Sequence, residues 1–598
     1  MTLGIDSAAE VQSHADRRPG QARHRRSREP ISLPASLSYE RIRARLPEIA
    51  LIVLATLGNS FFVLRDHSTP EWDQSNYLDT ALHLRNAVPV GFHAFFHAVL
   101  TTSPAKAPLY PLLIVPFFAL FDNSVRSALA LNVCLWPVLL VSVGAIAGDL
   151  FHDRRARLLA IVFTATMPLM VGLSHEVLQD FLLVTISTLT VALVIKSRLF
   201  SRPFVTALVG LSVGLGMLTK VTFPVFVLGP FAVVIASAVR RVVQSIRAKS
   251  WRQTVTLPRI LGLGVMVLLA VVIAALWYVP NYHATVDYIR STTGGPLSLG
   301  AGPSNPLTVS AIGSFTIGML TEHFSWVLTL GALIGVIGGL PRLRLWYERK
   351  ASLWNKGFAP ALLVSWALLP YLSVALGHNQ DVRLMAPAMP AGAIIVAGLL
   401  TAITVSALRR ASIAVVTVAA IFETVAIAVP FDAGFLPSEI SVSTGFGLAA
   451  IPLHGQAMGY EMPPGPGYGT QIIAAIENQS RTPFGKVRPE TIGVLESDPV
   501  VNGNTLGWIA DQRGDQFTIA NVSSSSSQHA GLVRSLSDFD YLLYVRQPPL
   551  PANSSENRLV LVNESFAADY LTSKDLGHFH LRGALPIGGG QNVEIFQP

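Results

Sequence analysis

Long apolar runs recur through residues 49–430, and they constrain the fold more than any other feature of the chain. Because backbone amides inside a bilayer must be hydrogen-bonded within the protein, such runs predict membrane-spanning helices. The composition agrees, since 51% of the 598 residues are hydrophobic, 13% are charged and the mean hydropathy is +0.48. We therefore predict a polytopic α-helical membrane protein. The runs cover residues 49–64, 108–121, 127–148, 158–173, 177–195, 203–218, 221–239, 258–279, 322–340, 358–376, 384–406 and 412–430.

One of these runs is too short to cross a bilayer as a helix. Residues 108–121 would extend over roughly 21 Å, against about 30 Å of hydrocarbon, so we expect an interfacial or re-entrant helix there. The remaining runs predict about eleven transmembrane helices. The basic clusters at 154–157, 240–252 and 342–356 then fall on the side of the N-terminus, which the positive-inside rule identifies as the cytoplasm. The chain after residue 430 is expected outside the cytoplasm.

Composition divides the chain into three parts. Residues 1–48 are rich in arginine and lack the apolar core of a signal peptide, so they predict a disordered cytoplasmic tail, and we assign them no nucleic-acid partner. Residues 49–430 form the membrane domain, with a long first external loop at 65–107. Residues 431–598 predict a soluble extracytoplasmic α/β domain. Its expected parts are strands at 491–495, 541–545 and 559–562, a helix at 471–478, a flexible linker at 523–527 and a turn-rich loop at 462–469.

The first external loop carries acids and aromatic residues soon after the first apolar run. Glu71, Trp72 and Asp73 precede apolar residues that recur at helical spacing from 77 to 88. That pattern predicts a helix lying in the membrane interface, which would hold Asp73 near the depth of lipid headgroups. Two roles stay open for Asp73 on chemistry alone, namely the N-terminal cap of this helix and a catalytic carboxylate.

A second pair of acids, Glu176 and Asp180, lies in a short turn between two apolar runs. Their spacing of four predicts that they share one helical face. They are either solvated at the end of a span or face the same cavity as Asp73. No histidine pattern with metal-ligand spacing accompanies them, so we predict no metal site and leave a divalent cation open as a cofactor.

Three basic residues, Lys106, Lys220 and Arg383, fall on the outer side against the general charge bias. Cations placed there favour an anionic partner such as a phosphate. The alternative is that these long side chains extend from helix ends toward water.

The order of these motifs resembles the GT-C glycosyltransferases. Residues 45–430 are similar to the dolichyl-phosphate-mannose protein mannosyltransferase superfamily, or family 39, whose bacterial members include aminoarabinose and galacturonic acid transferases acting on lipopolysaccharide. The motifs that carry the resemblance are Trp72-Asp73-Gln74 with Tyr77, Lys106-Ala107-Pro108-Leu109-Tyr110, Asp180, Leu218-Thr219-Lys220, and Arg383 before Pro387-Ala388-Met389-Pro390.

The resemblance implies an inverting transfer of a sugar from a polyprenyl-phosphate donor to an acceptor hydroxyl on the outer face of the plasma membrane, in bacteria the inner membrane. Asp73 matches the family's first-loop catalytic acid, Asp180 its second-loop acid, and Lys106 the lysine of a Lys-Pro-Pro-like motif. The predicted substrate- and phosphate-binding set is Lys106, Lys220, Arg383, Glu176 and Tyr77. Gln74, Asn76 and Ala107 depart from the family pattern, which leaves the acceptor and any use of a metal open.

Other functions share some of these features. A polysaccharide polymerase or ligase acting on a lipid-linked glycan would use the same outer site. A lipid-linked-sugar transporter predicts charges in the middle of spans and broken helices in matching halves. A non-catalytic assembly factor would tolerate loss of Asp73. The acids of this chain lie at the ends of apolar runs, which favours a transferase whose acceptor is a cell-envelope glycan, lipopolysaccharide, a lipid or a protein.

Overall fold

The computed structural model describes residues 39–65, 69–293, 305–349, 358–428, 439–444, 447–452, 468–481, 488–495, 501–522, 536, 539–546, 579–588 and 591–598. Most of the predicted basic tail, the linker at 523–527, most of the loop at 462–469 and the strand at 559–562 lie outside these residues. The chain forms two compact units, residues 1–47 and 48–598. The described part of the first unit is the beginning of helix α1, and all later elements belong to the second unit.

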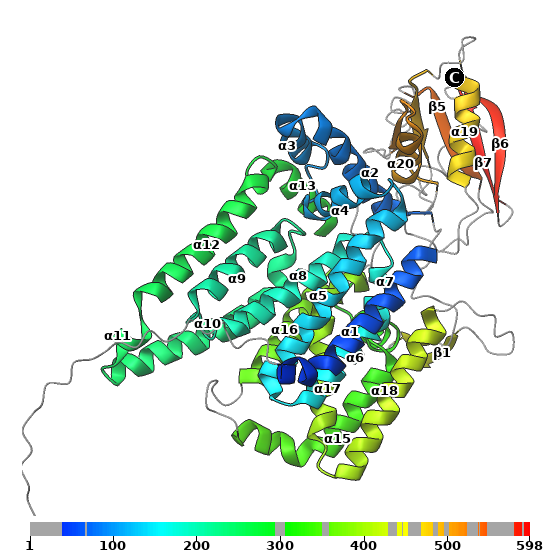
Figure 1. The fold of residues 1–598 in the computed structure, drawn as a ribbon. Helices are drawn as coiled ribbons and strands as arrows, with labels where there is room; N and C mark the ends of the chain where they lie inside the picture. Colours follow the sequence, from blue (N-terminus) through cyan, green and yellow to red (C-terminus); the bar gives the residue numbers. More distant parts are fainter. Residues whose placement is uncertain are drawn as a thin grey trace, which may run out of the picture. The chain divides into compact units, whose positions relative to one another are not determined.

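Long apolar helices dominate residues 48–428 (Figure 1). By length and composition, eight helices of the described chain are able to cross a membrane, or ten if each of two bent pairs forms one span. The apolar α9 (Pro203–Met217) is shorter, and with it the number agrees with the prediction of about eleven. The eight are α1 (Tyr39–Arg65), α5 (Val125–Phe151), α8 (Gln179–Lys196), α10 (Phe223–Arg247), α12 (Leu257–Tyr278), α16 (Phe358–Ala375), η5 (Val382–Ala388) with α17 (Met389–Ala402), and α18 (Ser406–Ala428).

The two bent pairs each contain a break of a few residues. Helices α6 (Arg154–Ala165) and α7 (Pro168–Ser174) meet at 57°. Pro168 stands at the start of α7, where its missing amide hydrogen leaves no intrahelical bond unmade. The second pair bends by 101° between α14 (Val309–Gly318) with η4 (Met319–His323) and α15 (Trp326–Arg349). Short helices α11 (Trp251–Thr254) and α13 (Tyr282–Thr293) flank α12.

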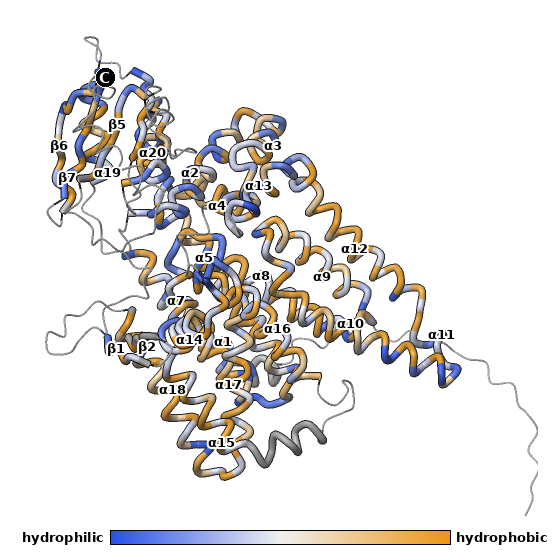
Figure 2. The backbone as a smooth tube through the Cα atoms, turned by 180° about the vertical axis from the view of Figure 1, so that it is seen from behind, coloured by the Kyte–Doolittle hydropathy of each residue, from blue (hydrophilic) through white to orange (hydrophobic). Residues whose placement is uncertain are grey.

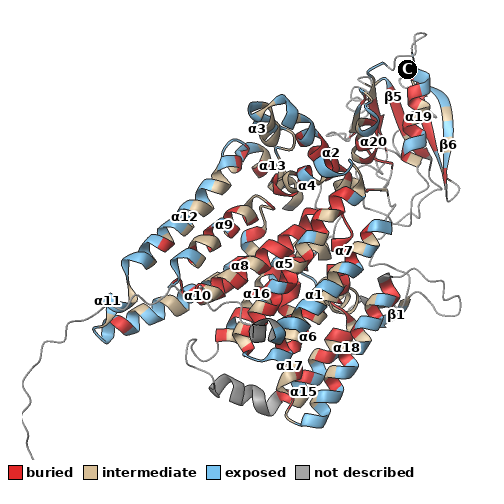
Figure 3. Ribbon diagram, in the orientation of Figure 1, coloured by how far each residue is buried: buried red, intermediate tan, exposed pale blue. Residues whose placement is uncertain are grey.

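Burial separates the helices that form the interior of the bundle from those that face outward. Helix α8 is buried over most of its length and packs on α5, α9 and α10 (Figure 3). Helices α1 and α12 are as apolar as α8, yet both leave most of their side chains exposed (Figures 2 and 3). An apolar exposed surface is favourable only against lipid, so this pattern supports a membrane-embedded bundle.

Residues 72–120, which cover most of the predicted first external loop and the short apolar run after it, form four short helices at one end of the long helices (Figure 1). They are α2 (Trp72–Ala87), η2 (Val88–Val90), α3 (Phe92–Thr101) and α4 (Leu109–Leu120). Helix α4 corresponds to the run at 108–121 that is too short to span a bilayer, and it packs against α2 and α5. Leu78, Ala81 and Leu82 of α2 are buried, whereas η2 and α3 bury no side chain fully.

The C-terminal region contains a hairpin and a five-stranded sheet. Antiparallel β1 (Glu439–Thr444) and β2 (Gly447–Pro452) form the hairpin. In the sheet, ordered β4-β3-β5-β7-β6, β3 is parallel to β4 and β5, whereas β7 is antiparallel to β5 and β6. The predicted strands at 491–495 and 541–545 correspond to β3 (Thr491–Val494) and β5 (Tyr541–Arg546), and the predicted helix to α19 (Tyr468–Ser480). Sequence analysis missed α20 (Gly503–Arg513), β4 (Thr518–Asn521), β6 (His580–Gly588) and β7 (Gln591–Gln597).

Candidate functional site

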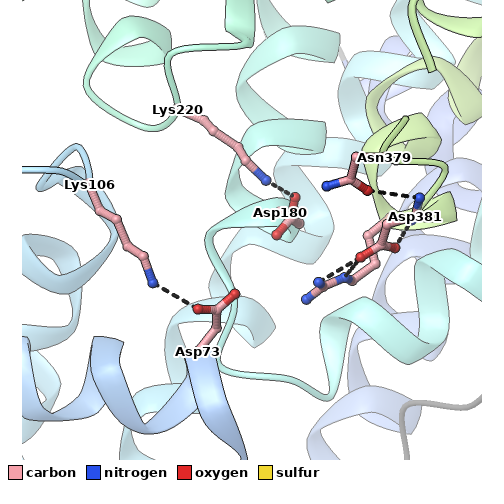
Figure 4. Close-up of polar contacts among 7 residues, drawn as sticks. Asp73, Lys106, Asp180, Lys220, Asn379 and Asp381 are labelled. Carbon is pink, nitrogen blue, oxygen red and sulfur yellow. Dashed lines mark hydrogen bonds and ion pairs between the residues drawn. The ribbon is translucent and has the colours of Figure 1, made fainter. Parts of the chain in front are cut away.

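Asp73 lies in the first turn of α2, with its side chain directed at a cation. Glu71 occupies the N-cap position of the helix, so the capping role considered for Asp73 is wrong. The ammonium of Lys106 donates a hydrogen bond of 2.8 Å to Asp73 Oδ1 (Figure 4). It donates a second one of 3.3 Å to Asn76 Oδ1. The same ammonium lies 5.3 Å from the centre of the Tyr77 ring, within range of a cation–π interaction.

The electrostatic surroundings keep the Asp73 carboxylate ionised. Burial opposes ionisation, but the positive charges of Lys106, Arg383 and Lys220 outweigh it and hold the pKa of Asp73 below its usual value. The Asp73 side chain is 46% exposed, whereas that of Lys106 is 16% exposed. Asp73 is therefore a charged and accessible group, and Lys106 is the partner that fixes its position.

A second ion pair joins the start of α8 to the turn between α9 and α10. Asp180 Oδ1 accepts a hydrogen bond of 2.8 Å from Lys220 Nζ. Glu176 lies before α8, whose N-cap is Leu178, so the prediction that Glu176 and Asp180 share one helical face is wrong. Burial raises the pKa of Glu176 well above its usual value, despite the opposing charge of Arg383. The backbone carbonyl of Glu176 accepts a hydrogen bond of 2.8 Å from Asn132 Nδ2.

A third ion pair, absent from the sequence predictions, lies at the start of η5. Arg383 donates from Nε at 2.7 Å to Asp381 Oδ2, and its Nη2 lies 2.6 Å from the same oxygen. Asn379 Oδ1 accepts from the backbone amide of Asp381 at 3.1 Å. Burial raises the pKa of Asp381, but Arg383 outweighs that effect and holds the pKa below its usual value. The polar run at 378–381, just before the predicted Arg383, was the sequence signal for this pair.

The three pairs lie near one another, although their residues are as far apart in the chain as 73 and 383 (Figure 4). Helix α8 packs on η5, which brings Asp180 toward Arg383. Tyr77 is buried and packs edge-on against Tyr110, with 5.6 Å between the ring centres. Burial and the negative charges of Asp73 and Asp180 raise the pKa of Tyr77. The seven residues of the predicted site thus belong to these three ion pairs or lie next to them. Each of the three cations, Lys106, Lys220 and Arg383, forms an ion pair with a carboxylate.

Helix α20 of the C-terminal region holds the backbone on which Asp73 sits. Thr505 Oγ1 donates to the carbonyl of Pro70 at 3.1 Å, and Ser75 Oγ donates to the same carbonyl at 2.8 Å. Asn504 Nδ2 donates to the carbonyl of Trp72 at 3.2 Å. Trp72 has a φ of 27°, a conformation that costs a bulky residue energy and needs such support. Ser75 and Thr505 are fully buried, so loss of either hydroxyl would leave unsatisfied polar groups.

The arrangement combines an ionised carboxylate with three cations at a membrane-embedded bundle. Carboxylates accept protons from hydroxyls, and lysine or arginine side chains bind phosphate oxygens. The geometry therefore suits acid–base chemistry beside a bound phosphate.

The chain is similar to one family of known proteins and to solved structures of two others. Residues 105–278 match the family described as dolichyl-phosphate-mannose-protein mannosyltransferase. The structure is similar to that of ArnT from Cupriavidus metallidurans bound to undecaprenyl phosphate, with a TM-score of 0.50 and 15% identity over 92% of this chain and 97% of that one. It is also similar to the archaeal oligosaccharyltransferase AglB from Archaeoglobus fulgidus in complex with an inhibitory peptide and a dolichol-phosphate, with a TM-score of 0.52 and 14% identity over 85% of this chain and 70% of that one.

No curated protein matches the sequence. The fold is the one that these two structures share, a bundle of long apolar helices. More specifically, it is the GT-C fold, with a C-terminal sheet region following the helical bundle.

Proposed function

We propose that this protein is an inverting glycosyltransferase that moves a sugar from a polyprenyl-phosphate donor to an acceptor hydroxyl. The observation that carries the proposal is Asp73, an ionised and accessible carboxylate that accepts a hydrogen bond from Lys106. The positive charges of Lys220 and Arg383 also lower its pKa. The similar structures support the donor class, since ArnT was solved bound to undecaprenyl phosphate and AglB in complex with a dolichol-phosphate.

In this mechanism Asp73 acts as general base. It takes the proton of the acceptor hydroxyl while the hydroxyl oxygen attacks the anomeric carbon of the donor. The new carbon–oxygen bond forms on the face opposite the phosphate, and the old bond breaks with its electron pair leaving on the phosphate oxygen. The products are an inverted glycoside, a polyprenyl phosphate and a protonated Asp73. The leaving phosphate gains negative charge, which nearby cations stabilise.

Lys106 has two successive roles in the proposal. In the free protein its ammonium lowers the pKa of Asp73, which keeps Asp73 ionised but also makes it a weak base. A donor phosphate attracts the same ammonium, and the hydrogen bond to Asp73 is weakened as a result. Binding of the donor thereby makes Asp73 more basic at the moment when a base is needed.

The other site residues orient the reactants. Asp180, held by Lys220, accepts a hydrogen bond from the acceptor or the sugar. Burial raises the pKa of Glu176 and of Tyr77 well above their usual values, which favours the protonated form of each, and that form is able to donate a hydrogen bond to a phosphate or sugar oxygen. Lys220 and Arg383 complete the set of cations for the phosphate.

The proposed setting is the outer face of the plasma membrane, which is the inner membrane in a bacterium. Residues 49–430 form the catalytic membrane domain, and 431–598 form an extracytoplasmic domain. The distribution of basic residues supports a cytoplasmic N-terminus. The acceptor is a cell-envelope glycan, lipopolysaccharide, a lipid or a protein.

The test is sugar transfer in proteoliposomes from a panel of polyprenyl-phosphate monosaccharides. Asp73→Asn keeps the size of the side chain and removes the base, so transfer should fall about 10²- to 10⁴-fold. Asp287→Asn is the matched control, because Asp287 lies on α13 and is 75% exposed. Equal activity of Asp73→Asn and wild type refutes the role of Asp73. Transfer only from a preassembled lipid-linked glycan would identify a polymerase or ligase, and donor translocation without transfer would identify a transporter.

A further inference from the structure

The turn between α7 and α8 carries Glu176 and leads into Asp180, but it is not helical. Helix α7 ends at Ser174 and α8 begins at Gln179. The four residues between them, 175–178, are all buried. Buried backbone amides and carbonyls need hydrogen-bond partners, and residues between two helices lack the regular partners of a helix. The groups that bind this turn therefore decide where its acids lie.

Two amide side chains of the bundle hold the turn. Asn132 of α5 is fully buried, and its Nδ2 donates to the carbonyl of Ser174 at 3.2 Å and to that of Glu176 at 2.8 Å. Asn132 Oδ1 accepts a hydrogen bond of 3.3 Å from the hydroxyl of Tyr110. Asn59 of α1 accepts one of 3.1 Å from Ser174 Oγ. The turn is thereby fixed to two long helices.

A third amide side chain joins the same turn to α2. Gln74 Oε1 accepts a hydrogen bond of 3.0 Å from the backbone amide of Val177. Gln74 follows Asp73 directly in the first turn of α2, and Val177 lies three residues before Asp180. One hydrogen bond thus connects the backbone segments that carry these two acids. The amide oxygen provides the acceptor without adding a charge beside Asp73.

We propose that Gln74 is a positioning residue that sets Asp73 against Asp180 and Glu176. The inference rests on the proposed transfer reaction, in which Asp73 takes a proton and the acids of the turn orient the reactants. The two asparagines hold the turn on the bundle, and Gln74 holds the start of α2 on the turn. Without its acceptor, the Val177 amide no longer fixes the distance between the two segments. A misplacement of about 1 Å is able to lower a rate about 10²-fold.

The experiment compares Gln74→Met and Gln74→Glu with wild type, using the full-length protein in nanodiscs. Methionine is similar in length but offers only a weak acceptor, whereas glutamate keeps an oxygen that is able to accept from Val177. Gln253→Met is the matched control, because Gln253 is exposed on α11. Mass spectrometry follows hydrogen exchange of peptides that contain the Val177 amide. The kcat and KM of sugar transfer are measured per folded protein, at the pH optimum of each variant.

We expect the Val177 amide to exchange at least about tenfold faster in Gln74→Met than in wild type. The same variant should have a kcat about 10- to 100-fold lower, with a smaller change in KM. Gln74→Glu should restore the protection of the amide and most of kcat, which a loss of stability alone would not explain. Gln253→Met should behave as wild type does.

The inference is overturned if Gln74→Met exchanges the Val177 amide as slowly as wild type, or exchanges it faster without losing kcat. A change in KM alone, with unchanged exchange, would identify Gln74 as a substrate contact instead. The proposed function has a separate readout, since it fails if Asp73→Asn transfers sugar as well as wild type. If wild type transfers no sugar, the proposed function fails, and exchange of the Val177 amide alone then decides whether Gln74 holds the turn.

Discussion

The ion pair between Lys220 and Asp180 offers a stringent test of how the site is built. Its two charged atoms are 2.8 Å apart, and the side chains are only 21% and 6% exposed. Lys220→Met leaves the Asp180 charge buried without this partner, which should cost about 3–5 kcal/mol of stability. Asp180→Asn combined with Lys220→Met removes both charges, and the double variant should be within about 1 kcal/mol of wild type.

A control for this prediction lies at the other end of α8. Lys196 pairs with Asp149 at the same distance of 2.8 Å, but the two side chains are 43% and 36% exposed. Water screens that pair, so Lys196→Met should cost no more than about 1 kcal/mol. If the two lysine variants lose different amounts of stability although both ion pairs have the same N–O distance, burial and not distance alone sets the contribution of such a pair to stability.

The assay is reversible unfolding of the protein in lipid micelles, followed by tryptophan fluorescence at pH 7. The reasoning is refuted if Lys220→Met is as stable as wild type, or if the double variant is as unstable as Lys220→Met. Sugar transfer measured on the same samples separates structure from chemistry. The double variant should regain stability and remain inactive, because Asp180 and Lys220 are both proposed to contact the substrates.

Two further predictions concern Asp73. Because Lys106 lowers the pKa of Asp73, Lys106→Met should raise that pKa. The acidic limb of the pH profile of kcat/KM, measured on the residual activity, should then move to higher pH. An unmoved limb would mean that Asp73 is not the titrating base. Thr505→Val should destabilise the protein by about 1–3 kcal/mol, because the Pro70 carbonyl loses one of its buried hydroxyl donors, and should lower kcat by displacing Asp73. Thr518→Val, at an exposed position of β4, should change neither quantity, and equal effects of the two variants would contradict the positioning role.

The sequence predicted the membrane bundle well because hydrophobic periodicity and length are local properties. The short run at 108–121 was recognised as α4 from its length alone. The role of Glu176 was harder to predict, since a spacing of four implies a shared face only inside a continuous helix, and the break before Leu178 is set by packing. Asp73 had two open roles because aspartate is a preferred N-cap residue, whereas the structure places Glu71 at the N-cap position without a capping hydrogen bond from its side chain.

Contacts between distant segments were beyond sequence reasoning. Nothing in residues 378–381 indicates that the Asp381–Arg383 pair will lie beside α8, and nothing in residues 502–505 indicates contact with Pro70. Helix α20 itself was missed, because its buried face is short and its polar residues resemble a loop.

The sequence by itself determined the class of fold, since apolar runs must become helices in a bilayer. It also determined which functional groups are available for a site, since only a few charged residues lie at the ends of those runs. Tertiary structure alone decided that Asp73, Asp180 and Asp381 lie near one another, each paired with its own cation. The physical reason is that helix periodicity arises from neighbouring residues, whereas an ion pair between residues 40 apart depends on how α8, α9 and η5 pack, and that packing minimises the energy of the whole bundle.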